Sequence, residues 1–103
     1  MINNEEFRKI ACAFPDVEEL PHFEKTSFRI KKKIFATLNE KENRGCVKLS
    51  ENDQYIFSQN EAGAVYPVPN KWGLQGWTNI DLNKASKKLL KEILKTAYKE
   101  VKN

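Results

Sequence analysis

The sequence predicts an α+β domain of two layers, in which an antiparallel sheet is covered on one face by an N-terminal and a C-terminal helix. Two apolar stripes at helical spacing, one at each end of the chain, predict the helices. Between them, short segments alternate apolar and polar residues and are separated by polar turns, which is typical of strands. At 103 residues, we expect residues 1–103 to form a single domain.

The first helix is expected over Asn4–Phe14, because Pro15 ends it. Asn3 or Asn4 can cap its first turn with a side-chain oxygen. The stretch Pro15–Pro21 is interpreted as a connector. The apolar side chains that form one face of this helix are Phe7, Ile10, Ala11 and Phe14.

Short antiparallel strands follow the connector. Lys31-Lys32 is the expected turn of one hairpin, and the polar stretch Asn39–Arg44 is the expected loop of the next. A short strand at His22–Lys25 would precede them. Alternating patterns predict strands at Ser27–Ile30 and Gly45–Leu49, and a run of residues that favour strands predicts another at Lys33–Leu38.

Two helices and a strand are expected in the second half of the chain. Ser50 is a plausible N-cap for a short helix over Glu51–Gln59, which a break at Asn60–Gly63 ends. The strongest helical pattern covers Lys84–Lys102, with Asn83 as its expected N-cap. Lysines recur along its polar face.

The most specific stretch is Val65–Leu82, which holds both tryptophans. Its prolines make Tyr66–Pro69 an extended segment that does not suit a central strand. Asn70 and Gly73 then allow a turn, and Trp77–Leu82 alternates as a strand does. This Pro/Trp loop is either a lid over the core or an exposed contact surface.

The formal net charge is +4, and it is distributed unevenly. Residues 1–24 carry six acids and two bases, whereas residues 84–103 carry seven lysines and two acids. This asymmetry indicates either an anionic partner or attraction between the terminal helices. No apolar run is long enough for a transmembrane helix, and the acidic N-terminal stretch is unlike a signal peptide, so we expect a cytoplasmic protein. Cys12 and Cys46 are expected to be reduced thiols in the core.

Three stretches carry a family resemblance. They are Phe14-Pro15, the hairpin from Ser27-Phe28-Arg29 to Ile34-Phe35-Ala36, and Pro67–Thr78. Together with the order of the elements, they make nearly the whole chain similar to the MmcQ/YjbR family. The resemblance implies a CyaY-like, or frataxin-like, α+β fold. It also implies DNA as a candidate partner, because members are described as candidate DNA-binding proteins by likeness to a phage double-wing domain. It carries over no catalytic residues.

Basic side chains indicate a weak, sequence-nonspecific nucleic-acid-binding surface, because they neutralise phosphates. The chain has few arginines and no recognition helix with base-reading side chains. A solvated hairpin turn and a solvated helix face explain the same lysines without function. Trp77 is a further possible contact beside the candidate binding residues, which are Lys25, Arg29, Lys31, Lys32, Lys33, Lys71, Trp72 and Gln75.

The alternative is a protein- or small-ligand-binding module that uses the Trp72 loop, since aromatic residues anchor interfaces. The acids of residues 5–19 are too sparse for a metal cage, so we expect no metal site. We expect no enzyme, because the lone His22 pairs with no recognisable nucleophile or phosphate loop. The chain is expected to be monomeric, without cofactor or membrane attachment.

Overall fold

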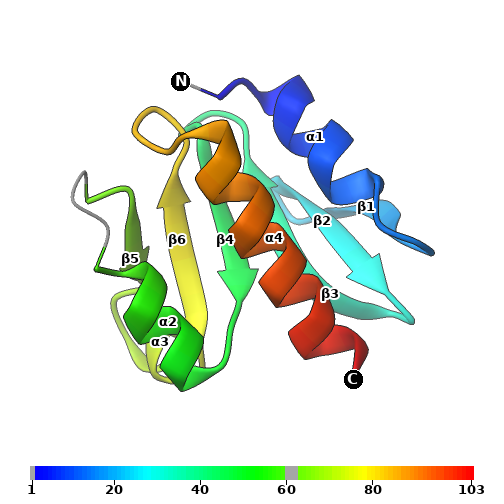
Figure 1. The fold of residues 1–103 in the computed structure, drawn as a ribbon. Coiled ribbons are helices and arrows are strands. Elements are labelled where there is room, and N and C mark those ends of the chain that lie inside the picture. The colour runs from blue at the N-terminus through cyan, green and yellow to red at the C-terminus, as the bar shows by residue number, and fades with distance from the viewer. Residues whose placement is uncertain (1, 60–62) are drawn as a thin grey trace.

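The computed structural model of the chain describes residues 2–59 and 63–103, and it contains a six-stranded antiparallel sheet. The strands are β1 (Glu18–His22), β2 (Lys25–Ile30), β3 (Lys33–Asn39), β4 (Arg44–Lys48), β5 (Val65–Pro67) and β6 (Trp77–Asp81). They lie in the order β1-β2-β3-β4-β6-β5. Two helices, α1 (Asn4–Cys12) and α4 (Lys87–Lys102), lie on the same face of this sheet (Figure 1). The predicted two-layer α+β fold is therefore confirmed.

Helix α1 begins with a capping box, as its sequence indicates. The Asn3 Oδ1 atom accepts a hydrogen bond from the Glu6 amide at 2.8 Å, and the Glu6 side chain accepts one from the Asn3 amide. The helix ends at Cys12, two residues before the predicted end at Phe14. The physical reason is that Phe14 precedes Pro15, and a residue in that position is disfavoured from helical geometry.

Helix α4 begins later than the sequence predicted. Its N-cap is Ser86, whose Oγ atom accepts a hydrogen bond from the Leu89 amide at 3.1 Å. The predicted cap, Asn83, lies instead in a turn that follows β6, and its Oδ1 atom accepts a hydrogen bond from Asn43 at 2.8 Å. The prediction of Asn83 as N-cap and Lys84 as first helical residue was therefore wrong.

Strand β1 was not predicted. The stretch Pro15–Pro21 was interpreted as a connector, but Glu18–His22 pairs with β2 as an edge strand. Pro21 is tolerated there because an edge strand leaves one row of backbone donors unused. The expected strand at His22–Lys25 is instead the two-residue turn, Phe23-Glu24, between β1 and β2.

The β2–β3 hairpin has the predicted Lys31-Lys32 turn, in which both residues have positive φ values, 51° and 70°. Positive φ at both central positions is typical of a type I′ hairpin turn. The register then shifts, since Phe28 pairs with Ala36 and Arg29 pairs with Ile34. This β-bulge leaves Phe35 as the extra residue and turns its ring toward the helices.

Helix α2 (Glu51–Phe57) is capped by Ser50 as predicted, but it ends two residues before Gln59. The predicted break at Asn60–Gly63 lies largely outside the described residues. Strand β5 is an edge strand, which agrees with the proline-rich sequence. A short helix, α3 (Lys71–Leu74), occupies what the sequence predicted as a simple turn.

The hydrophobic core lies between the sheet and the pair α1 and α4. The Phe14 ring stacks on Tyr98 with ring centroids 4.9 Å apart, and Phe35 meets Tyr98 edge-on at 5.6 Å. The Tyr98 hydroxyl donates a hydrogen bond to the Pro15 carbonyl at 2.7 Å. This core fixes the helices on one face, and the opposite face of the sheet carries the site described next.

Candidate functional site

The face of the sheet opposite α1 and α4 carries a row of side chains from neighbouring strands. Thr37 pairs with Cys46, Cys46 pairs with Asn79, and Asn79 pairs with Tyr66. Side chains of directly paired residues point to the same face of a sheet. The row therefore crosses the open face from β3 to β5.

A cavity of about 570 Å³ lies over this row. Its volume falls in the range of about 300–1,000 Å³ that small-molecule sites occupy. Both tryptophans of the chain and two cations line it, and none of its lining residues within 2–59 and 63–103 is acidic. The lining residues are His22, Lys25, Ile34, Thr37, Arg44, Cys46, Tyr66, Val68, Pro69, Asn70, Trp72, Trp77 and Asn79.

One wall of this sheet-face cavity is the Pro/Trp loop, which is held by backbone contacts. The Val68 amide donates to the Trp77 carbonyl at 3.0 Å, and the Asn70 Oδ1 atom accepts from the Trp72 amide at 2.8 Å. Gly73 lies so close to Val68 that an added Cβ would be 1.9 Å from the Val68 carbonyl oxygen. The loop can adopt this path because residue 73 lacks a side chain.

The side chains of Lys48 and Gln54 donate hydrogen bonds to backbone carbonyls in and after α3. Lys48 Nζ donates a hydrogen bond to the Gln75 carbonyl. The Gln54 amide nitrogen lies 2.9 Å from the Gly73 carbonyl and 3.2 Å from the Trp77 carbonyl. The loop is therefore anchored at both ends, and the Trp72 side chain, which is 50% exposed, is presented from a fixed backbone.

The charged side chains that line the cavity, among the described residues, are the cations Lys25 and Arg44. Lys25 comes from β2, next to β1, and Arg44 comes from the start of β4. The Arg44 guanidinium lies 3.6 Å from the Glu42 carboxylate, and both groups are solvent-exposed enough for that pair to be weak. Lys71 Nζ lies 5.7 Å from the centre of the Trp72 ring and adds a third cation at the rim.

The structure brings some of the predicted binding residues together. Lys25 and Trp72, which are far apart in the sequence, line the same cavity, and Lys71 lies against the Trp72 ring. Gln75 is the exposed C-cap residue of α3, at the end of the same loop. Trp77 also lines the cavity, so the two tryptophans share one surface.

The remaining predicted residues lie elsewhere. Arg29 donates a hydrogen bond from Nε to Ser27 Oγ at 3.0 Å and does not line the cavity. Lys31 and Lys32 form the turn at the opposite end of β2 from Lys25. Lys33 lines a smaller cavity beside the C-terminal residues of α4, which shares Ile34 and Trp77 with the sheet-face cavity.

Six residues outside the Pro/Trp loop line the cavity but were not predicted as binding residues, namely His22, Ile34, Thr37, Arg44, Cys46 and Asn79. The alternation Arg44-Gly45-Cys46-Val47-Lys48 does put Arg44 on the polar face of its strand. It does not say which strand lies next to β4. That neighbour is β6, which is separated from it by α2, β5 and α3.

The two cysteines lie on opposite sides of the sheet, and both are free thiols. Cys46 is partly buried in the sheet-face cavity, and this burial raises the pKa of its thiol. Cys12 is exposed and Cys46 lies outside the hydrophobic core, so the prediction of both as core thiols was wrong. Burial of the sulfur, and then the nearby Glu19 carboxylate, raise the pKa of Cys12, so neither thiol has the lowered pKa of a reactive nucleophile.

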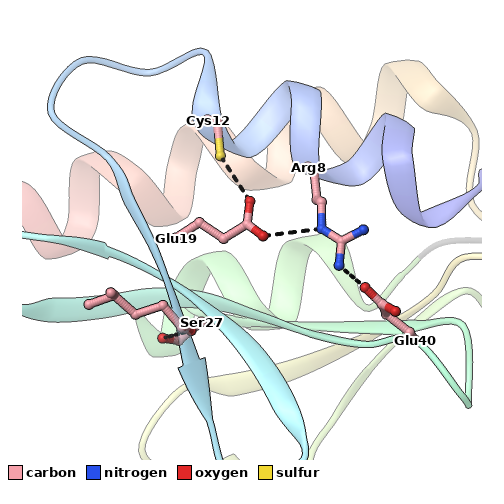
Figure 2. Close-up of polar contacts among 6 residues, drawn as sticks. Arg8, Cys12, Glu19, Ser27 and Glu40 are labelled. Atoms are coloured by element: carbon pink, nitrogen blue, oxygen red, sulfur yellow. Dashed lines mark hydrogen bonds and ion pairs between the residues drawn. The ribbon is translucent and has the colours of Figure 1, made fainter.

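Figure 2 shows the polar cluster that surrounds Cys12 on the helix side of the sheet. The Cys12 thiol donates to the Glu19 carboxylate at 3.7 Å, and Arg8 Nε donates to the same carboxylate at 3.2 Å. A second Arg8 nitrogen pairs with Glu40 in the β3–β4 loop. The cluster ties α1 to β1 and to that loop, which is a structural role.

Within residues 2–59 and 63–103, no group of three or more His, Cys, Asp or Glu side chains could hold a metal ion. A helix long and apolar enough to cross a membrane is likewise missing from the described parts of the chain.

Comparison with known proteins supports the family resemblance. The model of the YjbR family matches residues 12–100. Among solved structures, the fold is similar to Deinococcus radiodurans protein DR2400, which carries the family-model domain DUF419, with a TM-score of 0.84 and 20% sequence identity. The match covers 100% of this chain and 80% of that chain. No curated protein matches the sequence.

Proposed function

The chain belongs to the YjbR family, and we propose that it is a non-catalytic, monomeric module that binds single-stranded nucleic acid on the open face of its sheet. The observation that supports this proposal is the composition of the sheet-face cavity. Its lining combines both tryptophans with Lys25 and Arg44, and none of the described residues that line it carries a carboxylate. Aromatic rings and cations on an exposed sheet are the features with which proteins hold single strands.

The aromatic side chains favour a single strand over a duplex. Trp72 is 50% exposed and Tyr66 is 38% exposed, so both rings present surface to solvent. A base can stack on such a ring only when it has left the base stack of a duplex. Each stacked base contributes about 1–3 kcal/mol, which suits binding of modest affinity.

The cations give the proposal a measurable salt dependence. For single strands, the logarithm of the binding constant falls with the logarithm of the salt concentration by about 0.7 per phosphate contact. Contacts from Lys25 and Arg44 would therefore give a slope of about −1.4, and Lys71 would steepen it by a further ~0.7.

The test uses the tryptophans as the probe, since both line the cavity. The native chain is titrated with a short thymidine oligonucleotide and with a duplex, at low and at moderate salt, and the intrinsic fluorescence is recorded. Quenching by the single strand that weakens with salt is the expected result. No quenching by the single strand at low salt would contradict the proposal.

A pair of double variants locates the contact. Lys25→Ala with Arg44→Ala removes the two cavity cations, and Lys31→Ala with Lys32→Ala removes the same charge from the turn at the other end of β2. We expect the cavity variant to bind more weakly, with a salt slope smaller by about 1.4, and the turn variant to bind within about twofold of the native chain. If the turn variant lost binding and the cavity variant kept it, the nucleic-acid contact would lie at the Lys31-Lys32 turn.

A second candidate is a protein partner at the Trp72 loop, favoured by apolar side chains that are exposed beside it. Leu74 of α3 is 85% exposed and Tyr55 of α2 is 68% exposed. This candidate predicts association that persists at high salt, which sedimentation of the chain with its partner would detect. Salt-sensitive oligonucleotide binding at the cavity contradicts it.

A further inference from the structure

Phe23 is an aromatic residue that neither packing nor backbone geometry explains. It is the first residue of the two-residue turn between β1 and β2, and its side chain is 94% exposed. Its φ value is 60°, in the left-handed region that bulky residues seldom adopt. Glycine is the residue that such a turn position favours. Phe23 therefore combines a solvent-exposed apolar ring with a strained backbone conformation. Backbone strain of this kind is concentrated at functional positions.

The Phe23 ring borders a second cavity of about 500 Å³, which continues from the first. Its lining residues are His22, Phe23, Glu24, Lys25, Asn39, Lys41 and Glu42. His22 and Lys25 line both cavities. The His22 ring lies 4.8 Å from the Phe23 ring, in an edge-on arrangement. Aromatic surface therefore continues from the sheet-face cavity to the turn.

The two cavities differ in charge. In the part of the chain that the structure describes, the charged side chains of the sheet-face cavity are Lys25 and Arg44, whereas the two lysines of the turn cavity are balanced by Glu24 and Glu42. A phosphate is therefore favoured in the first cavity and disfavoured deep in the second. A neutral planar ring, such as a base, suits the second cavity, and Lys25 lies at the boundary between them.

We propose that one single strand crosses the sheet from Trp72 to Phe23, with a phosphate at Lys25 and a terminal base stacked on the Phe23 ring. This inference rests on the proposed function and adds a second stacking subsite to it. The sheet order puts five inter-strand spacings, about 24 Å, between β5 and β1. The path is longer than this width, because the Trp72 loop lies at the Trp77 end of β6, whereas Phe23 lies at the opposite end of the strands, next to Lys25. A strand that crosses the sheet therefore needs at least about four nucleotides, the low end of single-strand sites.

The experiment compares oligonucleotide lengths in the native chain and in Phe23→Asn. Asparagine tolerates a positive φ better than phenylalanine, so the variant is expected to fold and to melt at a higher temperature than the native chain. Binding of thymidine dinucleotide, tetranucleotide and octanucleotide is measured by tryptophan quenching. Octauridine is measured in parallel, and it distinguishes DNA from RNA as the source of the strand.

We expect Phe23→Asn to weaken octanucleotide binding about tenfold and to leave dinucleotide binding unchanged, because only the longer strand reaches the turn. Tyr55→Asn is the matched control, since it removes an exposed aromatic ring, at a residue that is 68% accessible, that lines neither cavity. Phe23→Trp should bind the octanucleotide at least as tightly as the native chain.

Two results would overturn the inference while leaving the proposed function intact. One is an unchanged octanucleotide affinity in Phe23→Asn when Trp72→Ala has lost binding. The other is a native affinity that does not rise from dinucleotide to octanucleotide. Absence of binding by the native chain at every length would instead refute the proposed function itself, so the two failures are distinguishable.

Discussion

Gly73→Ala is the substitution that tests how the Trp72 loop is held. A Cβ at this position would lie 1.9 Å from the Val68 carbonyl oxygen, whereas ordinary contacts begin at 3.4 Å. The two backbone segments would have to separate by about 1.5 Å. Overpacking of this kind costs about 1–3 kcal/mol. Helix propensity acts in the opposite direction, since alanine in a helix is more favourable than glycine by up to ~1 kcal/mol. The sign of the measured change therefore decides between the two effects.

The expected result is a loss of about 1–2 kcal/mol, which lowers the melting temperature of a chain of this size by roughly 5–15 °C. Thermal unfolding followed by tryptophan fluorescence measures it, because Trp72 and Trp77 flank the contact. Gly63→Ala is the control: Gly63 has a φ of 66°, but no atom lies within 4 Å of the position that an added Cβ would take, so it reports backbone strain without a clash. A Gly73→Ala chain as stable as the native one, or more stable, would refute the close packing of the loop on Val68.

Three other contacts give testable expectations. Ser86→Ala should cost about 1 kcal/mol in a urea denaturation experiment, whereas a helix cap at Asn83 would predict that cost for Asn83→Ala instead. A bound oligonucleotide should slow the alkylation of Cys46, which lines the cavity. The alkylation rate of Cys12, on the other side of the sheet, should stay the same. A Cys46 rate that the oligonucleotide does not change would count against the site. Glu6→Gln should lower stability at neutral pH, because the hydrogen bond from Lys87 and the Asn3 amide hold the pKa of Glu6 below its ordinary value of 4.5. A lowered folded-state pKa stabilises the fold above pH 4.5, so the difference between native and variant should vanish as the pH falls below that value, and a difference independent of pH would contradict the ion pair.

The layers of the fold were predictable because they depend on local patterns. The stripes of α1 and α4, the alternation in β2, β4 and β6, and the strand-favouring residues of β3 are visible in the sequence, and the structure has these elements. Strand β1 was missed because an edge strand with a proline carries little pattern, and its residues are mostly exposed. The start of α4 was misjudged because Asn83 and Ser86 are both good capping residues and only tertiary contacts choose between them.

The candidate site was only partly predictable, because it depends on pairing between distant strands. The Pro/Trp loop and Lys25 were identified from their residue types, but no local pattern indicates that they share a cavity. That proximity follows from β6 pairing with β4 across an intervening stretch that contains α2, β5 and α3. The sequence did not identify Phe23 for a different reason. The features that distinguish this residue are its backbone conformation and its exposure, which the residue type does not indicate.

The most direct test of the open sheet face as the binding surface is a nuclear magnetic resonance titration of the isotope-labelled chain with a single-stranded oligonucleotide. We predict that the indole N–H signals of Trp72 and Trp77 shift, together with the backbone amides of Thr37, Cys46 and Asn79. Shifts confined to the lysines of α4 or to the Lys31-Lys32 turn, with both indole signals unmoved, would contradict a site on this face.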